Sequence, residues 1–142
     1  MKEYVVGFVF TPDLSKVLLI KKDKGWQLGL YNGIGGSVEN GETPLQAMVR
    51  ECSEETGGYI FTTEKGWCYF TKMEGPDYIV HCFSTVAETI MNLDGKAPER
   101  ETLRVFNTNS IGITRTVPNL RWLIPLAQEQ YVDFPVIINQ VA

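Results

Sequence analysis

Runs of apolar, β-prone residues separated by polar turns occupy most of the chain. Residues 3–11 and 17–20 are two such runs on either side of a Thr-Pro-Asp-Leu-Ser turn, which predicts a hairpin over residues 3–21. Residues 21–32 and 94–98 are polar and predict loops. Further strands are predicted at residues 33–38, 59–71, 77–86, 103–106 and 133–138. The glycines of the 33–38 run indicate that the backbone there approaches another group closely.

Two segments carry helix signals. Thr43 is a good N-cap, Pro44 suits the first helical position and Gln46 completes a capping box, so a helix is predicted from about 44 to 56, ended by Gly57-Gly58. Pro118 opens a second predicted helix that runs to about Gln128, with Trp122 expected in the core. Because strands and helices interleave without regular βαβ alternation, we expect an α+β fold in one domain, residues 1–142. It would be a mixed sheet between helices, an α-β-α sandwich.

Composition and charge exclude several classes of protein. The 17 acidic residues outnumber the 13 basic ones, and the net charge of −4 lacks the basic footprint of a nucleic-acid-binding protein. We see no DNA-binding segment, no signal peptide and no run near the roughly 20 apolar residues of a membrane span, so no membrane contact and a cytoplasmic location are expected. The three cysteines are too widely spaced for a zinc site and are expected to be reduced and mostly buried.

The predicted helix 44–56 gathers acidic side chains at one place. Glu51 and Glu55 stack one turn apart and Glu54 lies beside them, next to an apolar stripe of Leu45, Met48, Val49 and Cys52. Each pair of like charges costs on the order of 0.2–0.5 kcal/mol, and Arg50 alone does not balance three carboxylates. A hard divalent cation would, and oxygen ligands favour Mg²⁺ or Mn²⁺ over Zn²⁺. The plainer interpretation is a solvated charged face.

Residues 36–58 contain a motif with fixed spacing, and it favours the metal site over the solvated charged face. From Gly36 the order is five residues, Glu, seven residues, then Arg-Glu-x-x-Glu-Glu-x-Gly, and its fixed positions are Gly36, Glu42, Arg50, Glu51, Glu54, Glu55 and Gly57. This segment resembles the Nudix box, the signature of the Nudix hydrolase family. Cys52 and Gly58 depart from its apolar positions, and both departures concern packing. The resemblance implies a Nudix fold in which the box forms a loop–helix–loop.

The same resemblance implies roles for the box residues. Glu51, Glu54 and Glu55, with the carbonyl of Gly35, would bind Mg²⁺, or Mn²⁺ in its place. Arg50 would orient the carboxylates, and Glu42 would steady the loop. The implied reaction is hydrolysis of a phosphoanhydride bond in a nucleoside diphosphate-linked substrate.

The remainder of the chain resembles the branch of oxidised-purine nucleoside triphosphatases, in Lys21-Lys22, residues 31–36, residues 80–83, Trp122 and Pro125-Leu126. In that branch the residue matching Asn32 hydrogen-bonds the purine, and the aromatic matching Trp26 lines the base pocket. At the second helix, Val117-Pro118-Asn119-Leu120 replaces an aromatic and two acids.

Each of these residues also has a plainer interpretation. Asn32 fits a turn residue, Trp26 fits loop packing, Lys22 fits either a phosphate contact or a solvated strand end, and Asn119 fits either a base contact or a helix cap. The only histidine, His81, lies in a strand and is expected to be structural.

We therefore expect a Mg²⁺-dependent enzyme that converts a purine (deoxy)nucleoside triphosphate, with 8-oxo-dGTP as one candidate, to the monophosphate and pyrophosphate. Glu54, with Arg50 and Glu51, is the expected catalytic group, and Glu99 or Glu101 is the alternative base. Other substrates remain open: ADP-ribose, a dinucleoside polyphosphate, a nucleotide sugar or an RNA cap. So do a non-catalytic nucleotide sensor and a partner-binding protein. The expected partner is a small nucleotide, and the sequence leaves the choice between monomer and homodimer open.

Overall fold

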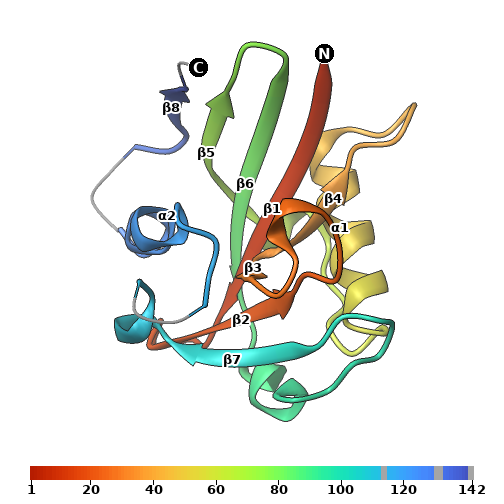
Figure 1. The fold of residues 1–142 in the computed structure, drawn as a ribbon, viewed down its shortest axis with the longest axis vertical. Helices are drawn as coiled ribbons and strands as arrows, with labels where there is room; N and C mark the ends of the chain where they lie inside the picture. Colours follow the sequence, from red (N-terminus) through yellow and green to blue (C-terminus); the bar gives the residue numbers. More distant parts are fainter. Residues whose placement is uncertain (113–114, 130–132, 141–142) are drawn as a thin grey trace.

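The computed structural model describes residues 1–112, 115–129 and 133–140, which form one mixed sheet with helices on both faces. Its central path is β3-β2-β1-β6-β5-β8, and β4 and β7 pair with β1 and β2 beside that path (Figure 1). The strands are β1 (Lys2–Phe10), β2 (Lys16–Lys21), β3 (Tyr31–Asn32), β4 (Ile34–Ser37), β5 (Cys68–Glu74), β6 (Tyr78–Val86), β7 (Leu103–Asn107) and β8 (Val136–Asn139).

Strand β1 is the centre of this sheet. It pairs in parallel with β6 along its whole length, from Lys2 to Phe10. Its other edge is shared: residues 4–7 pair with β4, and Val9 and Phe10 pair with β2. Side chains of β1 enter both faces of the sheet, and this explains why its sequence is a continuous apolar run rather than an alternating one.

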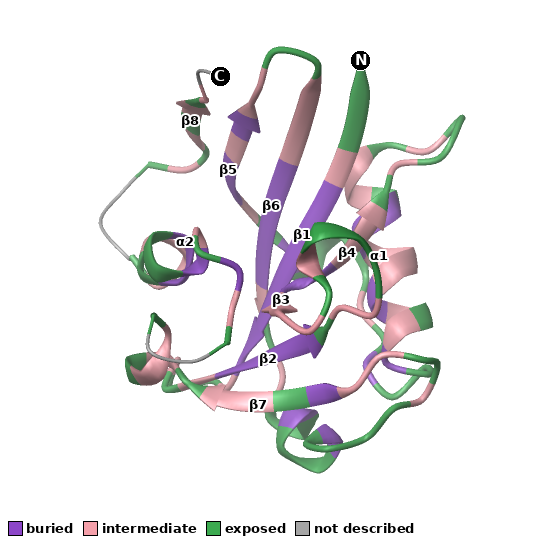
Figure 2. Cartoon of the chain, in the orientation of Figure 1, coloured by how far each residue is buried: buried purple, intermediate pink, exposed green. Residues whose placement is uncertain are grey.

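The two helices cover opposite faces of the sheet. Helix α1 (Pro44–Glu55) lies on one side and α2 (Leu120–Ala127) on the other (Figure 1). The buried residues gather along the middle of β1, β2 and β6, between these layers (Figure 2). The expected sheet between helices is therefore confirmed. Four short 3-10 helices complete the described elements: η1 (Gly25–Gln27), η2 (Glu64–Gly66), η3 (Glu88–Leu93) and η4 (Thr108–Ser110).

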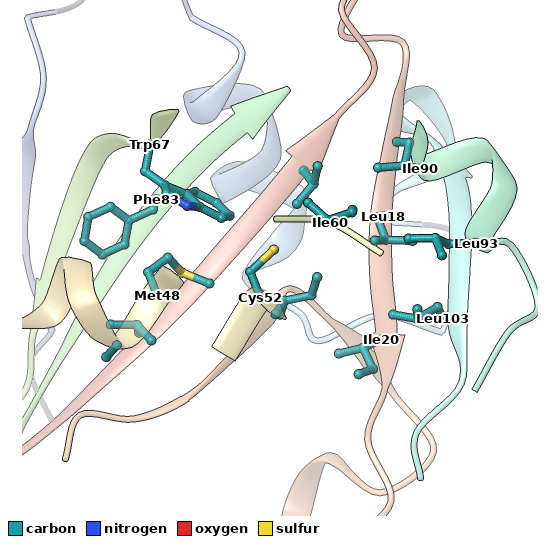
Figure 3. Packing of buried hydrophobic residues seen from close by; sticks show 14 residues of the cluster. Leu18, Ile20, Met48, Cys52, Ile60, Trp67, Phe83, Ile90, Leu93 and Leu103 are labelled. Carbon is teal, nitrogen blue, oxygen red and sulfur yellow. The ribbon is translucent and has the colours of Figure 1, made fainter. Parts of the chain in front are cut away.

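Helix α1 packs directly against β1. Met48 and Cys52 enter a core shared with Trp67 and Phe83 (Figure 3). A Cβ on Gly7 would come within 2.6 Å of the sulfur and terminal methyl of Met48, so glycine at this position lets the helix approach the strand. The same approach fixes the height of the acidic residues on α1 above the sheet.

Two expectations from the sequence are wrong in detail. The strand predicted at 59–71 begins only at Cys68, because Gly57 and Gly58 take positive φ and turn the chain into a loop that buries Ile60 and leaves Phe61 exposed. Trp122 is not in the core. Leu120, Leu123 and Ile124 form the inward face of α2, and Trp122 lies on the other face, 39% exposed.

Other expectations are confirmed with shifted ends. The second helix starts at Leu120, and the last strand starts after Pro135. All three cysteines are free thiols, and Cys52 and Cys82 are buried. Among the helices of the described residues, none combines the length and the apolar character needed to cross a membrane.

The capping box of α1 gives a test of the local folding signal. The Thr43 hydroxyl accepts from the Gln46 N–H at 3.1 Å, and the Gln46 side chain accepts from the Thr43 N–H at 2.9 Å. We expect Thr43→Ala to lower the free energy of unfolding by about 1 kcal/mol, measured by urea denaturation. Ser53→Ala, on the same helix, is the matched control. An unchanged midpoint for Thr43→Ala would show that tertiary packing alone holds the start of α1.

Candidate metal and nucleotide site

Strand β4 brings bare backbone against the acidic end of α1. The Gly35 N–H donates to Glu55 Oε1 at 2.9 Å. A Cβ on Gly35 would collide with the carbonyl of Val5, and a Cβ on Gly36 would lie 2.8 Å from the carboxylate of Glu51. Gly35 thus makes room for the β1–β4 pairing, and Gly36 makes room for the Glu51 carboxylate.

Glu51 and Glu55 are held largely out of water. Burial raises the pKa of Glu55 to about 8, and the nearby Glu51 and Glu101 add to the rise while Lys22 and the Gly35 N–H oppose it. Burial also raises the pKa of Glu51, against the hydrogen bond and charge of Arg50. Two adjacent carboxylates that resist ionisation form the kind of site that a bound cation stabilises.

Arg50 is the hub that orders the acids of the box. Its Nε and Nη2 donate to Glu42 at 2.8 and 2.9 Å, and its Nη1 donates to Glu51 at 2.7 Å and to Glu54 at 3.3 Å. Nη2 also donates to the carbonyl of Ser37 at 3.1 Å, which ties α1 to the end of β4. The bond from Arg50 lowers the pKa of Glu42 to about 2. Arg50 therefore contacts Glu42, Glu51 and Glu54 at once, and the roles that the resemblance implies for Arg50 and Glu42 stay predictions.

Glu54 lies apart from the other two carboxylates. Its side chain is 57% exposed and turns towards Arg50. Within the described residues, no three acidic, histidine or cysteine side chains come close enough to hold a metal ion together. The structure therefore brings Glu51 and Glu55 together, while Glu54 contacts the same Arg50 nitrogen as Glu51 and stays largely exposed. Helical spacing places Glu54 beside the pair but does not fix its rotamer.

A cavity of about 530 Å³ opens beside this pair, here called the acidic cavity. Besides Glu51 and Glu55, its charged lining residues are the acids Asp23, Glu99 and Glu101 and the bases Lys22, Lys24 and Arg100. The two loops that carry these groups are tied together. The Asp23 N–H donates to Glu101 at 2.9 Å, and Lys22 Nζ lies 4.0 Å from Glu101. With a side chain only 19% exposed, Lys22 is not a solvated lysine.

A second cavity of about 630 Å³, here called the amide cavity, adjoins the first. The two share Tyr4, Lys22, Gln27, Gly35 and Gly36 as lining residues. Its polar lining is mostly neutral amides, Gln27, Asn32, Asn119 and Gln140, among the apolar side chains of Val6, Met73, Val80, Val117 and Leu123. The pair of cavities forms one space with an acidic part and an uncharged part.

The expected base-contacting residues lie on this second cavity. Asn32 is held in place, since its Nδ2 donates to Gln27 at 2.9 Å and its Oδ1 accepts from the Gly33 N–H at 2.7 Å. Asn119 makes no side-chain cap to α2 that the described residues show, and its Oδ1 is buried there without a hydrogen-bond partner. Trp26 stands at the rim, 74% exposed. Of the two interpretations of Asn119, the helix cap is therefore not the one that the structure shows.

His81 takes no part in either cavity. Its Nδ1 lies 2.7 Å from the Tyr69 hydroxyl, and its Nε2 lies 2.8 Å from Glu3 Oε1. Its neighbour Val80 lines the amide cavity, and alternation along β6 places His81 on the α1 side of the sheet.

Comparisons with known proteins identify the family of this chain. The NUDIX domain family matches residues 1–126. The chain belongs to the Nudix family. The oxidized purine nucleoside triphosphate hydrolase of Mus musculus is 37% identical over 83 residues, which cover 57% of this chain and 52% of the mouse protein. The uncharacterized Nudix hydrolase YvcI of Bacillus subtilis is 32% identical over 111 residues, which cover 75% of this chain and 67% of that protein.

The likeness extends to solved structures. The MutT protein from Bacillus halodurans has a TM-score of 0.71 and 17% identity, over 99% of this chain and 90% of that chain. At that identity the likeness shows the Nudix fold alone. The chain spans about half the length of the mouse relative.

Some lining residues of this Nudix site escaped the sequence analysis. Tyr4 follows the strand alternation of Val6 and could have been placed from it. Tyr78 and Gln140 could not, because their position depends on β8 pairing in parallel with β5 and on β5 pairing with β6. No local pattern in a sequence gives such pairings.

The burial of Glu55 predicts a pH-dependent stability. With a folded pKa of about 8 and an unfolded pKa of about 4.3, the folded state holds the proton more tightly. The stabilisation of the folded state by this bound proton is complete below about pH 4 and is lost as the pH rises to about 8. Without divalent ions, the free energy of unfolding of Glu55→Gln should equal that of the wild type near pH 4.5. At pH 9 it should be higher than that of the wild type by on the order of 2–3 kcal/mol, after allowing for partial solvent access.

Urea denaturation in EDTA at the two pH values measures this difference. Glu54→Gln, at an exposed position of the same helical turn, is the control and should show little change with pH. A pH-independent gain for Glu55→Gln would mean that the Glu55 carboxylate ionises normally in the folded protein.

Proposed function

We propose that this chain hydrolyses a phosphoanhydride bond in a nucleoside diphosphate-linked substrate with the help of Mg²⁺, and that a purine (deoxy)nucleoside triphosphate is its substrate. The observation that carries the proposal is the continuity of the two cavities. Buried carboxylates line one, neutral amides and apolar side chains line the other, and Tyr4, Gly35 and Gly36 form the junction. A nucleotide has the same division into a charged and an uncharged part.

The donor set of the acidic cavity fits a hard divalent cation. Glu51, Glu55 and the carbonyl of Gly35 would hold Mg²⁺ or Mn²⁺, and Glu54 could join them by leaving Arg50. Such an ion supplies charge neutralisation for phosphate oxygens and acidifies water. Arg50 would keep Glu51 oriented, and Lys22, which lines both cavities, would contact a phosphate.

In the reaction a water oxygen bonds to phosphorus and a bridging P–O bond breaks. A triphosphate then yields the monophosphate and pyrophosphate. A carboxylate must accept the proton of the water. Glu54, Glu99 and Glu101 are the candidates. We favour Glu101, because it lines the acidic cavity with Glu55 and accepts from the Asp23 N–H, whereas Glu99 is exposed and Glu54 turns to Arg50 outside the cavity lining.

The lining of the amide cavity favours a purine base as the uncharged part of the substrate. Its volume of about 630 Å³ suits a small-molecule site, and apolar walls with few polar groups are typical of such sites. The buried Oδ1 of Asn119 needs a donor, which a base N–H supplies. Trp26 at the rim offers a stacking surface. The name of the mouse relative, an oxidized purine nucleoside triphosphate hydrolase, supports the inclusion of 8-oxo-dGTP among the candidates.

A substrate panel tests the proposal. We expect Mg²⁺-dependent pyrophosphate release from standard or 8-oxo purine triphosphates, and weaker turnover of ADP-ribose, dinucleoside polyphosphates and nucleotide sugars. Asn119→Leu should lower kcat/KM for the best substrate by roughly tenfold or more, because it removes the buried acceptor. Nucleotide binding by calorimetry without hydrolysis anywhere on the panel would favour a nucleotide sensor instead.

Two variants distinguish the candidate bases. If Glu101 accepts the proton, Glu101→Gln should lower kcat by about 100-fold or more and leave the Mn²⁺ affinity within a few-fold. Glu54→Gln should then reduce activity far less. The measurements are kcat at saturating Mg²⁺ and Mn²⁺ titration by electron paramagnetic resonance. The reverse pattern of losses assigns the proton transfer to Glu54.

A further inference from the structure

A chain of three hydrogen-bonding groups leads from the backbone beside β1 to the short helix η1. The Gly33 N–H donates to Oδ1 of Asn32 at 2.7 Å, and Nδ2 of Asn32 donates to Oε1 of Gln27 at 2.9 Å. A Cβ on Gly33 would come within 2.7 Å of the Gly7 carbonyl oxygen, so this backbone lies directly against β1. At the other end, the Gln27 carbonyl accepts from the Leu30 N–H at 2.8 Å. The chain therefore joins two pieces of backbone that are both held in place.

The first donor sets the direction of the whole chain. A backbone N–H can only donate, so the atom of the Asn32 amide that faces Gly33 must be the oxygen. The other end of the Asn32 amide is then an NH₂ group, which can also only donate. The atom of Gln27 that faces it must therefore be Oε1. Turning either amide over would bring two donors together. The end of the Gln27 amide that the chain does not use is thus Nε2, a donor.

Nε2 of Gln27 is open to the space beside it. Among residues 1–112, 115–129 and 133–140, the one fully buried side-chain nitrogen or oxygen without a hydrogen-bond partner is Oδ1 of Asn119. The Gln27 side chain makes one hydrogen bond within these residues, through Oε1. Nε2 is therefore accessible from the cavities, and Gln27 lines both of them. The donor lies where the acidic cavity meets the amide cavity.

The boundary between the two cavities has its own chemical character. Within the described residues, carboxylates line the acidic cavity and none lines the amide cavity, so none lies on the boundary. The residues that line both cavities are Tyr4, Lys22, Gln27, Gly35 and Gly36. The side chains among them offer a hydroxyl, an ammonium group and an amide NH₂, and each of these can donate. An anionic group with several acceptor oxygens matches such a boundary.

In a nucleotide, the phosphate bonded to the sugar lies between the remaining phosphates and the uncharged nucleoside. We infer that Gln27 is a substrate-binding residue whose Nε2 donates to an oxygen of this sugar-bound phosphate, and that Asn32 orients it. The inference rests on the proposed function, because it takes a nucleotide to span both cavities. When a triphosphate is cleaved to the monophosphate and pyrophosphate, the sugar-bound phosphate stays in the monophosphate. Gln27 therefore contacts both substrate and product.

The experiment compares nucleoside monophosphates with their nucleosides. Calorimetry on the full chain in Mg²⁺ gives dissociation constants for dGMP and deoxyguanosine, and for dAMP and deoxyadenosine. The members of each pair differ only in the sugar-bound phosphate. Gln27→Met keeps the length of the side chain and removes its donor. It should raise the dissociation constant of the more tightly bound monophosphate by roughly tenfold, because hydrogen bonds to charged groups are strong.

Gln27→Glu separates the donor from the contact with Asn32. Glutamate keeps an oxygen that accepts from Nδ2 of Asn32, but it replaces Nε2 with a second oxygen, which repels a phosphate. The dissociation constant of the monophosphate should rise further than in Gln27→Met, while that of the nucleoside should stay within about twofold. Equal weakening of monophosphate and nucleoside would show that Gln27 does not act on the phosphate and would overturn the inference.

Leu28→Glu controls for the added negative charge. Leu28 is 64% exposed and lines neither cavity. A carboxylate in bulk solvent there is screened, so both dissociation constants should stay within about twofold of the wild type. If Leu28→Glu weakens monophosphate binding as much as Gln27→Glu does, the effect comes from net charge and the inference is wrong.

Turnover of the same variants keeps this inference apart from the proposed function. Hydrolysis by the wild type, with monophosphate affinities that do not change in Gln27→Met and Gln27→Glu, would overturn the role of Gln27 and leave the proposed function intact. The expected pattern of affinities without hydrolysis of any nucleotide would overturn the proposed function and keep the role of Gln27. A wild type that binds dGMP and dAMP no more tightly than their nucleosides would overturn the inference.

Discussion

The contact between Glu55 and the backbone of Gly35 is the constraint on which the site depends. It joins the end of α1 to the strand that borders β1, and it places a carboxylate where water is scarce. Burying an acid is unfavourable unless hydrogen bonds or a cation compensate. Here the Gly35 N–H supplies one hydrogen bond, and the neighbouring Glu51 adds repulsion. The apolar side of the same helix, through Met48 and Cys52, holds both carboxylates in this position.

The helix that carries the acids was predictable because its signals are local. Thr43, Gln46 and the paired glycines after the helix act on neighbours in the chain, and the structure shows the capping box that they form. The rotamers of Glu51 and Glu54 were not predictable. They depend on how one arginine divides its hydrogen bonds among Glu42, Glu51 and Glu54, and helical spacing carries no information on that division.

The cavity walls were predictable only in part, for a different reason. Asn32 and Trp26, which the resemblance singles out, both line the amide cavity, and their contact with a base stays a prediction. Residues 59–67 were mistaken for a strand because they include β-prone residues. Ile60 and Trp67 are buried there, but the segment belongs to no strand, since β5 begins at Cys68. Gln140 joins the cavity through the parallel pairing of β8 with β5, which brings together segments more than 60 residues apart.

Strand β1 imposes an order on assembly during synthesis. Lys2 pairs with Tyr78 and Phe10 with Val86, so the longest pairing of the sheet is completed only after β6 has left the ribosome. Until then an early, strongly apolar segment lacks its main partner and is covered only by the nearby β2 and β4. Contacts between such distant segments slow folding and lengthen the time during which apolar surface is exposed. The arrangement that lets one strand line both cavities therefore leaves that strand without its longest partner until most of the chain has been synthesised.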